Sequence, residues 1–167
     1  MTFGSHANAA ELDELDSAIL RVLQQNARTT LADVGRAAGL AASSVHERLR
    51  RLQRDGVVRG WTLDLDPTAV GRPVTAFVGV EANPRGGPLV DAFRRMPLVD
   101  ECHNVAGEMS FLLKVRAAGT SELSELVDQL GELTGVRRTL TTVVLRTEFE
   151  RRLVLAPRRQ EVPRPGA

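Results

Sequence analysis

The chain has 167 residues, with 22 lysine and arginine residues against 21 acidic ones, and 43% of it is hydrophobic. These values predict a folded protein of one medium or two small domains. Its one cysteine excludes an internal disulfide and a cysteine-based metal cluster, and the lack of tyrosine argues against base stacking on single-stranded nucleic acid. Because no apolar run is long enough for a membrane and no signal-peptide pattern is seen, we expect a cytoplasmic protein without a metal or cofactor.

The first third of the chain predicts three helices behind a flexible arm at residues 1–10. Apolar residues recur at helical spacing over residues 13–26, which predicts the first helix. The Thr30–Asp33 capping pattern starts a second helix, and Gly39–Leu40 makes the short break that a helix-turn-helix requires. A third helix ends near Arg54, and its apolar stripe is formed by Val45, Leu49 and Leu52.

The outer face of this third helix is rich in arginine. Residues 28–59 hold seven arginines and three acidic residues, a local charge of +4 in a chain of net charge +1. Such a face is usually only solvated, but behind a short turn it suits the DNA major groove, and we predict a helix-turn-helix domain at residues 11–56. Arg48 lies nearer the apolar stripe, where an ion pair with the first helix is as plausible as a DNA contact.

Seven residues of the third helix are our candidates for DNA binding. Those that face away from the apolar stripe suit base edges, because arginine reads guanine and glutamate reads cytosine: Ser43, Glu47 and Arg50. Those that flank them suit phosphates: Ser44, Arg51 and Arg54. His46 suits either partner. The expected DNA is double-stranded, and a dimer would read a pseudo-palindromic operator.

Two segments lie outside the expected domains. Turn-forming residues predict an extended linker or hinge at residues 57–73, in which Val57 to Leu65 reads as an extended segment after a helix-turn-helix that we expect to be of the winged type. The C-terminal end reads as a short edge strand at residues 151–155 and a Pro/Arg-rich tail at residues 157–167. A solvated tail is favoured there over a DNA contact.

Residues 74–156 alternate between helix and strand patterns. One helix is predicted after Pro88 and another after a Thr120–Ser121 cap, and strands are predicted at residues 74–81, 99–106, 109–117 and 136–146. The order β-α-β-β-α-β is that of a ferredoxin-like unit, so the fold class is α+β. Cys102, in the second strand, is expected to be a small buried residue. With both helices on one sheet face, the bare face is expected to pack on a second copy of the chain.

These patterns together resemble the Lrp/AsnC family of bacterial and archaeal transcription regulators. The resemblance covers about residues 11–157 and is carried by five motifs: Leu12–Leu20, Gly39–Leu52, Gly56–Trp61, Glu101–Val115 and Gly135–Leu145. It implies an N-terminal unit that binds DNA. It also implies a ferredoxin-like (RAM or AsnC-type) unit that pairs subunits and senses a small molecule, often an amino acid. Dimers of the family commonly assemble into tetramers or octamers, which implies association with the nucleoid.

The resemblance also implies an effector site at the hairpin after the second strand and at the start of the last strand. The positions carried over are Asn104, Val105, Gly107, Glu108, Ser110, Thr141 and Val143. Gly107 allows a ligand to approach backbone amides, and Glu108 can accept from a ligand ammonium group. Two positions depart from the family pattern. Ser110 stands where an aspartate is usual, and Ala41 stands where a serine is usual, so the cap of the third helix must come from Ser43 or the backbone.

Two alternative functions are open at this point. Siroheme decarboxylases are similar in fold, and such an enzyme would need histidine and cationic side chains in the second domain, where His103 lies in a predicted strand. The other alternative is a nucleoid-organising protein that binds DNA without any effector. The sequence shows no paired carboxylates, nucleophile–base spacing or phosphate loop, so we expect a regulator rather than an enzyme.

Overall fold

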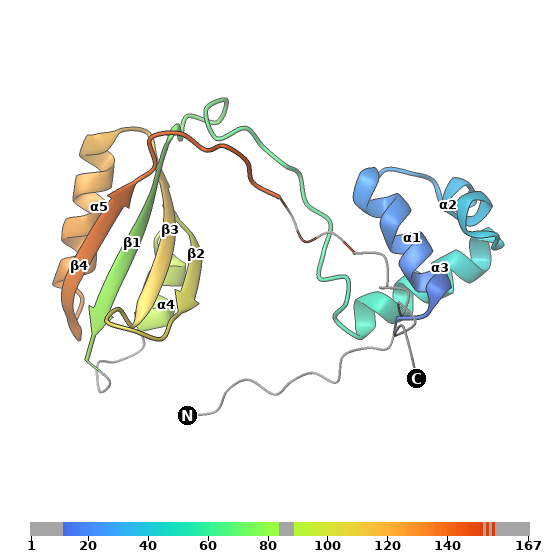
Figure 1. The fold of residues 1–167 in the computed structure, drawn as a ribbon, viewed down its shortest axis with the longest axis horizontal. Helices are drawn as coiled ribbons and strands as arrows, with labels where there is room; N and C mark the ends of the chain where they lie inside the picture. The colour runs from blue at the N-terminus through green and yellow to red at the C-terminus, as the bar shows by residue number, and fades with distance from the viewer. Residues whose placement is uncertain (1–11, 84–88, 152, 154, 156–167) are drawn as a thin grey trace, which may run out of the picture. The chain divides into compact units, whose positions relative to one another are not determined.

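The computed structural model describes residues 12–83, 89–151, 153 and 155. The chain divides into two compact units. Residues up to Leu63, with those from Glu150 onward, form the first unit, and residues Asp64–Phe149 form the second (Figure 1). No helix among the described residues is long and apolar enough to span a membrane.

The first unit contains the three predicted helices: α1 (Glu14–Gln25), α2 (Leu31–Ala38) and α3 (Ala42–Arg54). Asp13 caps α1 and Thr30 caps α2, each with a side-chain oxygen that accepts a backbone N–H of the first turn. The turn between α2 and α3 uses Gly39 at φ +69°, a conformation that glycine adopts without strain. The N-cap of α3 is Ala41, which makes no side-chain hydrogen bond, so neither the usual serine nor Ser43 caps this helix.

The core of the first unit is aliphatic. Its buried cluster takes residues from each of the three helices: Ile19, Leu23, Val34, Val45 and Leu49. Leu52 is also buried, so the whole apolar stripe of α3 faces inward as its spacing predicts. The opposite face of α3 is thereby left to solvent.

The predicted wing is absent from the part of the chain that the structure describes. No strand occurs between α3 and the first strand of the second unit, and residues 59–65 have no regular secondary structure. A strand requires a hydrogen-bonded neighbour, and no described segment of the same chain pairs with these residues. The strand expected at 151–155 is likewise not formed by the described residues there.

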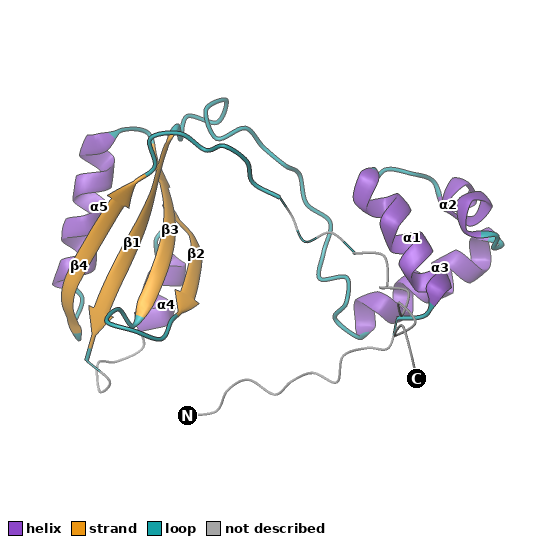
Figure 2. Cartoon of the chain, in the orientation of Figure 1, coloured by secondary structure: helices purple, strands orange, loops and turns teal. Residues whose placement is uncertain are grey.

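The second unit is a four-stranded antiparallel sheet with strand order β2-β3-β1-β4. Its strands are β1 (Val74–Ala82), β2 (Val99–Asn104), β3 (Phe111–Ala117) and β4 (Val136–Val143). With α4 (Leu89–Arg95) and α5 (Thr120–Glu132), this is the predicted βαββαβ order, and the α+β fold class is confirmed (Figure 2). The predicted cap of α5 is wrong: its N-cap is Gly119, which makes no side-chain cap bond.

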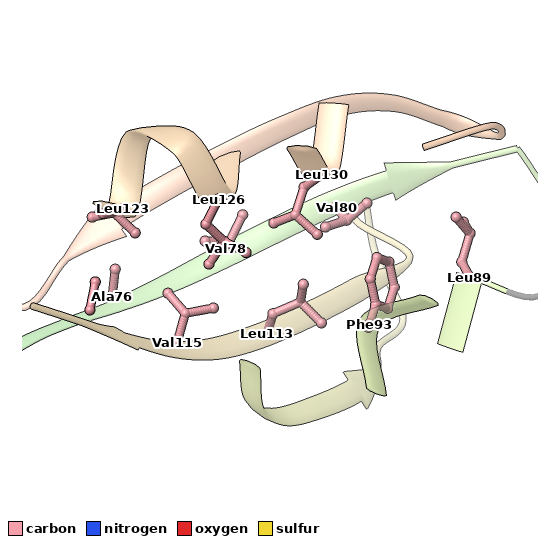
Figure 3. Packing of buried hydrophobic residues seen from close by; sticks show 11 residues of the cluster. Ala76, Val78, Val80, Leu89, Phe93, Leu113, Val115, Leu123, Leu126 and Leu130 are labelled. Carbon is pink, nitrogen blue, oxygen red and sulfur yellow. The ribbon is translucent and has the colours of Figure 1, made fainter. Parts of the chain in front are cut away.

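Both helices pack on one face of the sheet. Leu123, Leu126 and Leu130 of α5 and Phe93 of α4 meet alternate residues of the two central strands: Ala76, Val78, Val80, Leu113 and Val115 (Figure 3). Phe93 meets Phe111 edge-to-face, with ring centroids 5.4 Å apart. These contacts fix the register of the sheet, because a slip by one residue would turn every one of these side chains to the other face.

The opposite face of the sheet carries exposed apolar residues. Phe77 and Leu140 lie on it, and their side chains are 37% and 57% exposed. Lys114, opposite Phe77, is nearly buried and lies 3.8 Å from a carboxylate oxygen of Glu101. Cys102 is exposed, which corrects the expectation of a buried residue. It lies on an edge strand whose described residues are mostly exposed, so no second layer covers it.

Gly35 sets the distance between α2 and α3, because a Cβ there would overlap the carbonyl oxygen of Leu40. We expect Gly35→Ala to destabilise the protein by about 1–3 kcal/mol, since the turn must shift to make room. Gly131→Ala is the control, because nothing lies near its Cβ and alanine favours the helix by up to about 1 kcal/mol. Urea unfolding measures both. A Gly35→Ala protein as stable as wild type would contradict the steric argument.

Candidate DNA-binding surface and effector site

The outer face of α3 presents most of the predicted DNA-binding side chains to solvent. Ser43, His46, Glu47, Arg50 and Arg54 are all exposed, and Ser44 is half-buried. Arg54 is 74% exposed and lies 3.3 Å from Asp55, an ion pair that contributes little in water. The face therefore offers short polar groups near the start of the helix and arginines along the rest of it.

A buried carboxylate on α1 holds α3 from the inner side. Asp16 is only 1% exposed, and its two oxygens pair with Arg48 at 2.9 Å and Arg51 at 2.5 Å. Arg48 also pairs with Asp13 at 2.5 Å. Asp13 and Asp16 accept each other's backbone N–H in a capping box. We call these four residues, Asp13, Asp16, Arg48 and Arg51, the carboxylate clamp.

The clamp explains the charge states at its edge. The backbone N–H of Asp16 and the guanidinium of Arg48 hold the pKa of Asp13 below its ordinary value. The carboxylates of Asp13 and Asp16 raise the pKa of Arg48 above its ordinary value, so that side chain stays charged. The ion pair between Arg48 and α1 that the sequence left open is therefore present.

Arg51 has a contact within the chain that the sequence did not predict. The sequence assigned it to phosphates, whereas one of its terminal nitrogens binds Asp16 and its side chain is 43% exposed. Its guanidinium is thus held against α1 at the edge of the outer face. Sequence spacing did not reveal this, because a residue at the flank of a helix reaches either inward or outward depending on where an opposite charge lies.

The residues predicted for the effector come from two places in the second unit. Asn104 to Ser110 belong to the β2–β3 hairpin, where Gly107 has φ +136° and Val105 N–H donates to the Ser110 carbonyl at 3.1 Å. Thr141 and Val143 lie on β4, opposite Val78 and Ala76 of β1. Ser110 instead bonds to β1 at Val80 and Ala82. Val143 and Ser110 are therefore roughly 13–20 Å apart along β1.

Two hairpin side chains already have partners within the chain. The hydroxyl of Ser110 accepts from the Ala82 N–H at 3.1 Å and lies 3.3 Å from the Ala82 carbonyl, where β1 shifts register. Glu108 is 90% exposed, and its nearest cation is Arg138 at 3.9 Å. Arg138 was not among the predicted residues. Arg138 lies opposite Glu81 of β1 in the sheet and pairs with it, which brings Arg138 beside the hairpin.

Other chemistry receives no support from the described residues. They contain no group of three or more histidine, cysteine or acidic residues that could hold a metal ion. His103, the residue that an enzyme reading would use, is exposed and lies 3.0 Å from Glu101 on the same strand. A neighbouring carboxylate orients this imidazole without forming a pocket around it.

Family models match both units of the chain. Residues 12–53 match the AsnC-type helix-turn-helix domain, and residues 75–154 match the Lrp/AsnC ligand binding domain. The chain belongs to the Lrp/AsnC family. The resemblance seen in the sequence is thereby confirmed, and this Lrp/AsnC protein is a transcriptional regulator with a DNA-binding and a ligand-binding domain.

Several relatives and solved structures support this assignment. The HTH-type transcriptional regulator LrpA of Mycobacterium tuberculosis is 36% identical over 144 residues, which are 84% of this chain and 95% of that protein. A feast or famine regulatory protein from the same organism, solved with L-methionine, has a TM-score of 0.81 and 34% identity over 87% of this chain and 99% of that one. A Neisseria meningitidis transcriptional regulator, also solved with L-methionine, has a TM-score of 0.78 and 29% identity over 83% and 93%. Relatives named as transcriptional regulators support a regulator and not a siroheme-type enzyme.

The clamp predicts a large effect of a small change in this Lrp/AsnC chain. Asp16→Asn leaves two arginines without their shared carboxylate, and we expect a loss of about 3 kcal/mol in the free energy of unfolding. Asp33→Asn is the matched control, because Asp33 pairs with Arg36 on an exposed surface and its loss should change the stability far less. Urea titration compares the two. Equal, small losses would show that the clamp adds no stability.

Proposed function

We propose that this regulator binds a pseudo-palindromic operator in double-stranded DNA as a homodimer, with α3 in the major groove. The observation that carries the proposal is the polar and arginine-rich outer face of α3, exposed while its apolar stripe and the clamp hold the inner face. A helix held on one side and open on the other meets the requirement for reading base edges.

The side chains of the outer face divide into two groups by the part of the DNA that each would contact. Ser43, Glu47 and Arg50 suit base edges, and Ser44, His46 and Arg54 suit phosphates or, for His46, either partner. One terminal nitrogen of the Arg51 guanidinium binds Asp16, so only its other N–H groups would contact a phosphate. Its main contribution in this proposal is to fix the angle of α3 against α1.

The proposed homodimer forms through the open face of the sheet. Phe77 and Leu140 are large apolar side chains on this face, and a second copy would remove them from water. Assembly of dimers into tetramers or octamers on the nucleoid belongs to the same proposal. It would also bring Val143 of one chain near the hairpin of another, since the two are roughly 13–20 Å apart along β1 within one chain.

We further propose that the effector is an amino acid. The support is that two similar proteins were solved with L-methionine and that the chain matches the ligand-binding model of the family. Asn104, Val105, Gly107, Glu108, Ser110, Thr141 and Val143 remain the proposed contacts. Glu108 is the acceptor for the ligand ammonium group, since Ser110 carries no charge and its hydroxyl bonds to β1.

The use of Ser110 within the sheet also favours a second candidate function. A site without the usual aspartate has one anionic partner fewer for an ammonium group. If Glu108 stays with Arg138, the protein would bind DNA without responding to an amino acid. That protein would be an effector-independent, nucleoid-organising member of the family.

The DNA proposal is tested with the purified full chain on its own upstream DNA and on scrambled duplex. Arg50→Ala should lose about 10–100-fold on the upstream DNA and much less on the scrambled duplex, because it removes a base contact. Arg54→Ala should weaken binding to both alike and lower the salt slope by about one. Arg94→Ala, an exposed arginine of α4, is the control. The division of roles fails if Arg50→Ala and Arg54→Ala lose equally on both DNAs.

The effector proposal is tested by calorimetry and DNA-binding shifts with a panel of amino acids that includes L-methionine. Glu108→Gln should weaken binding of the responding amino acid by about tenfold, because it removes a charged acceptor. Glu132→Gln, an exposed glutamate at the end of α5, should not. DNA binding with no response to any amino acid would support the effector-independent function instead.

A further inference from the structure

A pocket of about 370 Å³ lies within the second unit, away from the proposed effector residues. Leu65, Pro67 and Val70, from the segment that precedes β1, form its apolar wall. Arg72 lies next to them, and Asp100 of β2 and Arg116 of β3 form the polar wall. None of these six residues belongs to the hairpin or to β4, so the pocket is a separate site.

The apolar wall is part of an ordered loop. The Val70 N–H donates to the Asp66 carbonyl at 3.2 Å, and the Arg72 N–H donates to the Pro67 carbonyl at 2.7 Å. Gly71 turns the chain at φ +77°. The Asp66 carboxylate accepts the Thr68 N–H at 2.9 Å, which stabilises the start of the loop. The wall is therefore formed before any ligand arrives, which lowers the cost of binding.

The pocket carries a net positive charge. Arg116 is paired with Asp100, and both side chains are largely buried. Arg72 donates to the Pro97 carbonyl at 2.8 Å, a neutral partner that leaves its charge uncompensated. Two arginines against one aspartate give the lining a charge of +1. A guanidinium of this kind binds a carboxylate through paired N–H groups.

The apolar wall adds a second requirement for the ligand. Leu65 and Val70 are 59% and 52% exposed, so large aliphatic surface faces the pocket opening. The volume is at the small end of the roughly 300–1,000 Å³ found for ligand pockets. We propose that this pocket binds a small monocarboxylate with an apolar chain, its carboxylate at Arg72 and its chain against Leu65 and Val70.

Binding at this place acts on the connection between the two units. Leu65 and Val70 belong to the segment that follows the DNA-binding unit in sequence, whereas Asp100 and Arg116 belong to the sheet. A ligand that contacts both walls ties this segment to the sheet edge. The pocket is therefore a second input to the regulator, independent of the amino acid proposed for the hairpin.

The test is a calorimetric titration of the full chain with 4-methyl-2-oxopentanoate, a branched monocarboxylate without an ammonium group. We expect saturable binding that Arg72→Gln weakens by at least about tenfold and that Val70→Ser weakens severalfold. The matched controls are Arg94→Gln and Val90→Ser, exposed residues of α4, which should leave the affinity unchanged. Trp61, the one tryptophan of the chain, is four residues before Leu65 and provides a fluorescence readout.

Three outcomes overturn the proposal. One is the absence of saturable binding at concentrations up to about 10 mM. Another is binding that Glu108→Gln abolishes and Arg72→Gln leaves intact, which would place the ligand at the hairpin. The third is acetate binding as tightly as the branched acid, which would remove the role of the apolar wall. If Val70→Ser lowers the oligomer mass in sedimentation and no carboxylate binds, a second copy of the chain covers this wall instead.

Discussion

The buried carboxylate of Asp16 is the constraint on which the DNA-binding unit depends. The Asp16 carboxylate accepts the backbone N–H of the N-cap residue of α1 in the capping box, and it also pairs with two arginines of α3. A buried carboxylate is costly without partners, so the arrangement is stable only when α1 and α3 meet at one angle. The apolar core of five aliphatic residues would tolerate small slides of α3, since aliphatic contacts are not directional. The clamp removes that freedom and leaves Arg50 and Arg54 as the outward arginines of the helix.

The second unit achieves order differently. Its sheet is fixed by apolar packing against two helices, and polar contacts are placed at its margins. Glu81 meets Arg137 and Arg138 at one margin, and Asp100 meets Arg116 near the other. Because the ion pairs of the exposed Arg137 and Arg138 contribute little to stability, these two positions are free to serve recognition. The hairpin and the linker pocket both lie at such margins, which is where a change of side chain alters binding without unfolding the sheet.

Periodicity predicted the elements well because burial imposes it. Val45, Leu49 and Leu52 recur on α3, and Val78 and Val80 alternate on β1, since each element has one buried face. The predictions that were wrong concern properties that the hydrophobic periodicity of the sequence does not contain. The exposure of Cys102 depends on what covers an edge strand, and the wing requires a pairing partner. Arg51 shows the same limit at the DNA-binding surface, because its direction depends on Asp16, thirty-five residues earlier in the chain.

The linker has less freedom than its sequence indicates. Residues 66–72 are tied by three backbone hydrogen bonds within the loop, and Arg72 bonds to the Pro97 carbonyl of the second unit. Residues 59–65, by contrast, have exposed side chains and no regular secondary structure. The first unit also holds the chain after β4, because the amide of Gln24 bonds to the Leu153 carbonyl and the Leu155 N–H. Two segments of the chain thus connect the units, and only the one that precedes β1 contributes residues to the linker pocket.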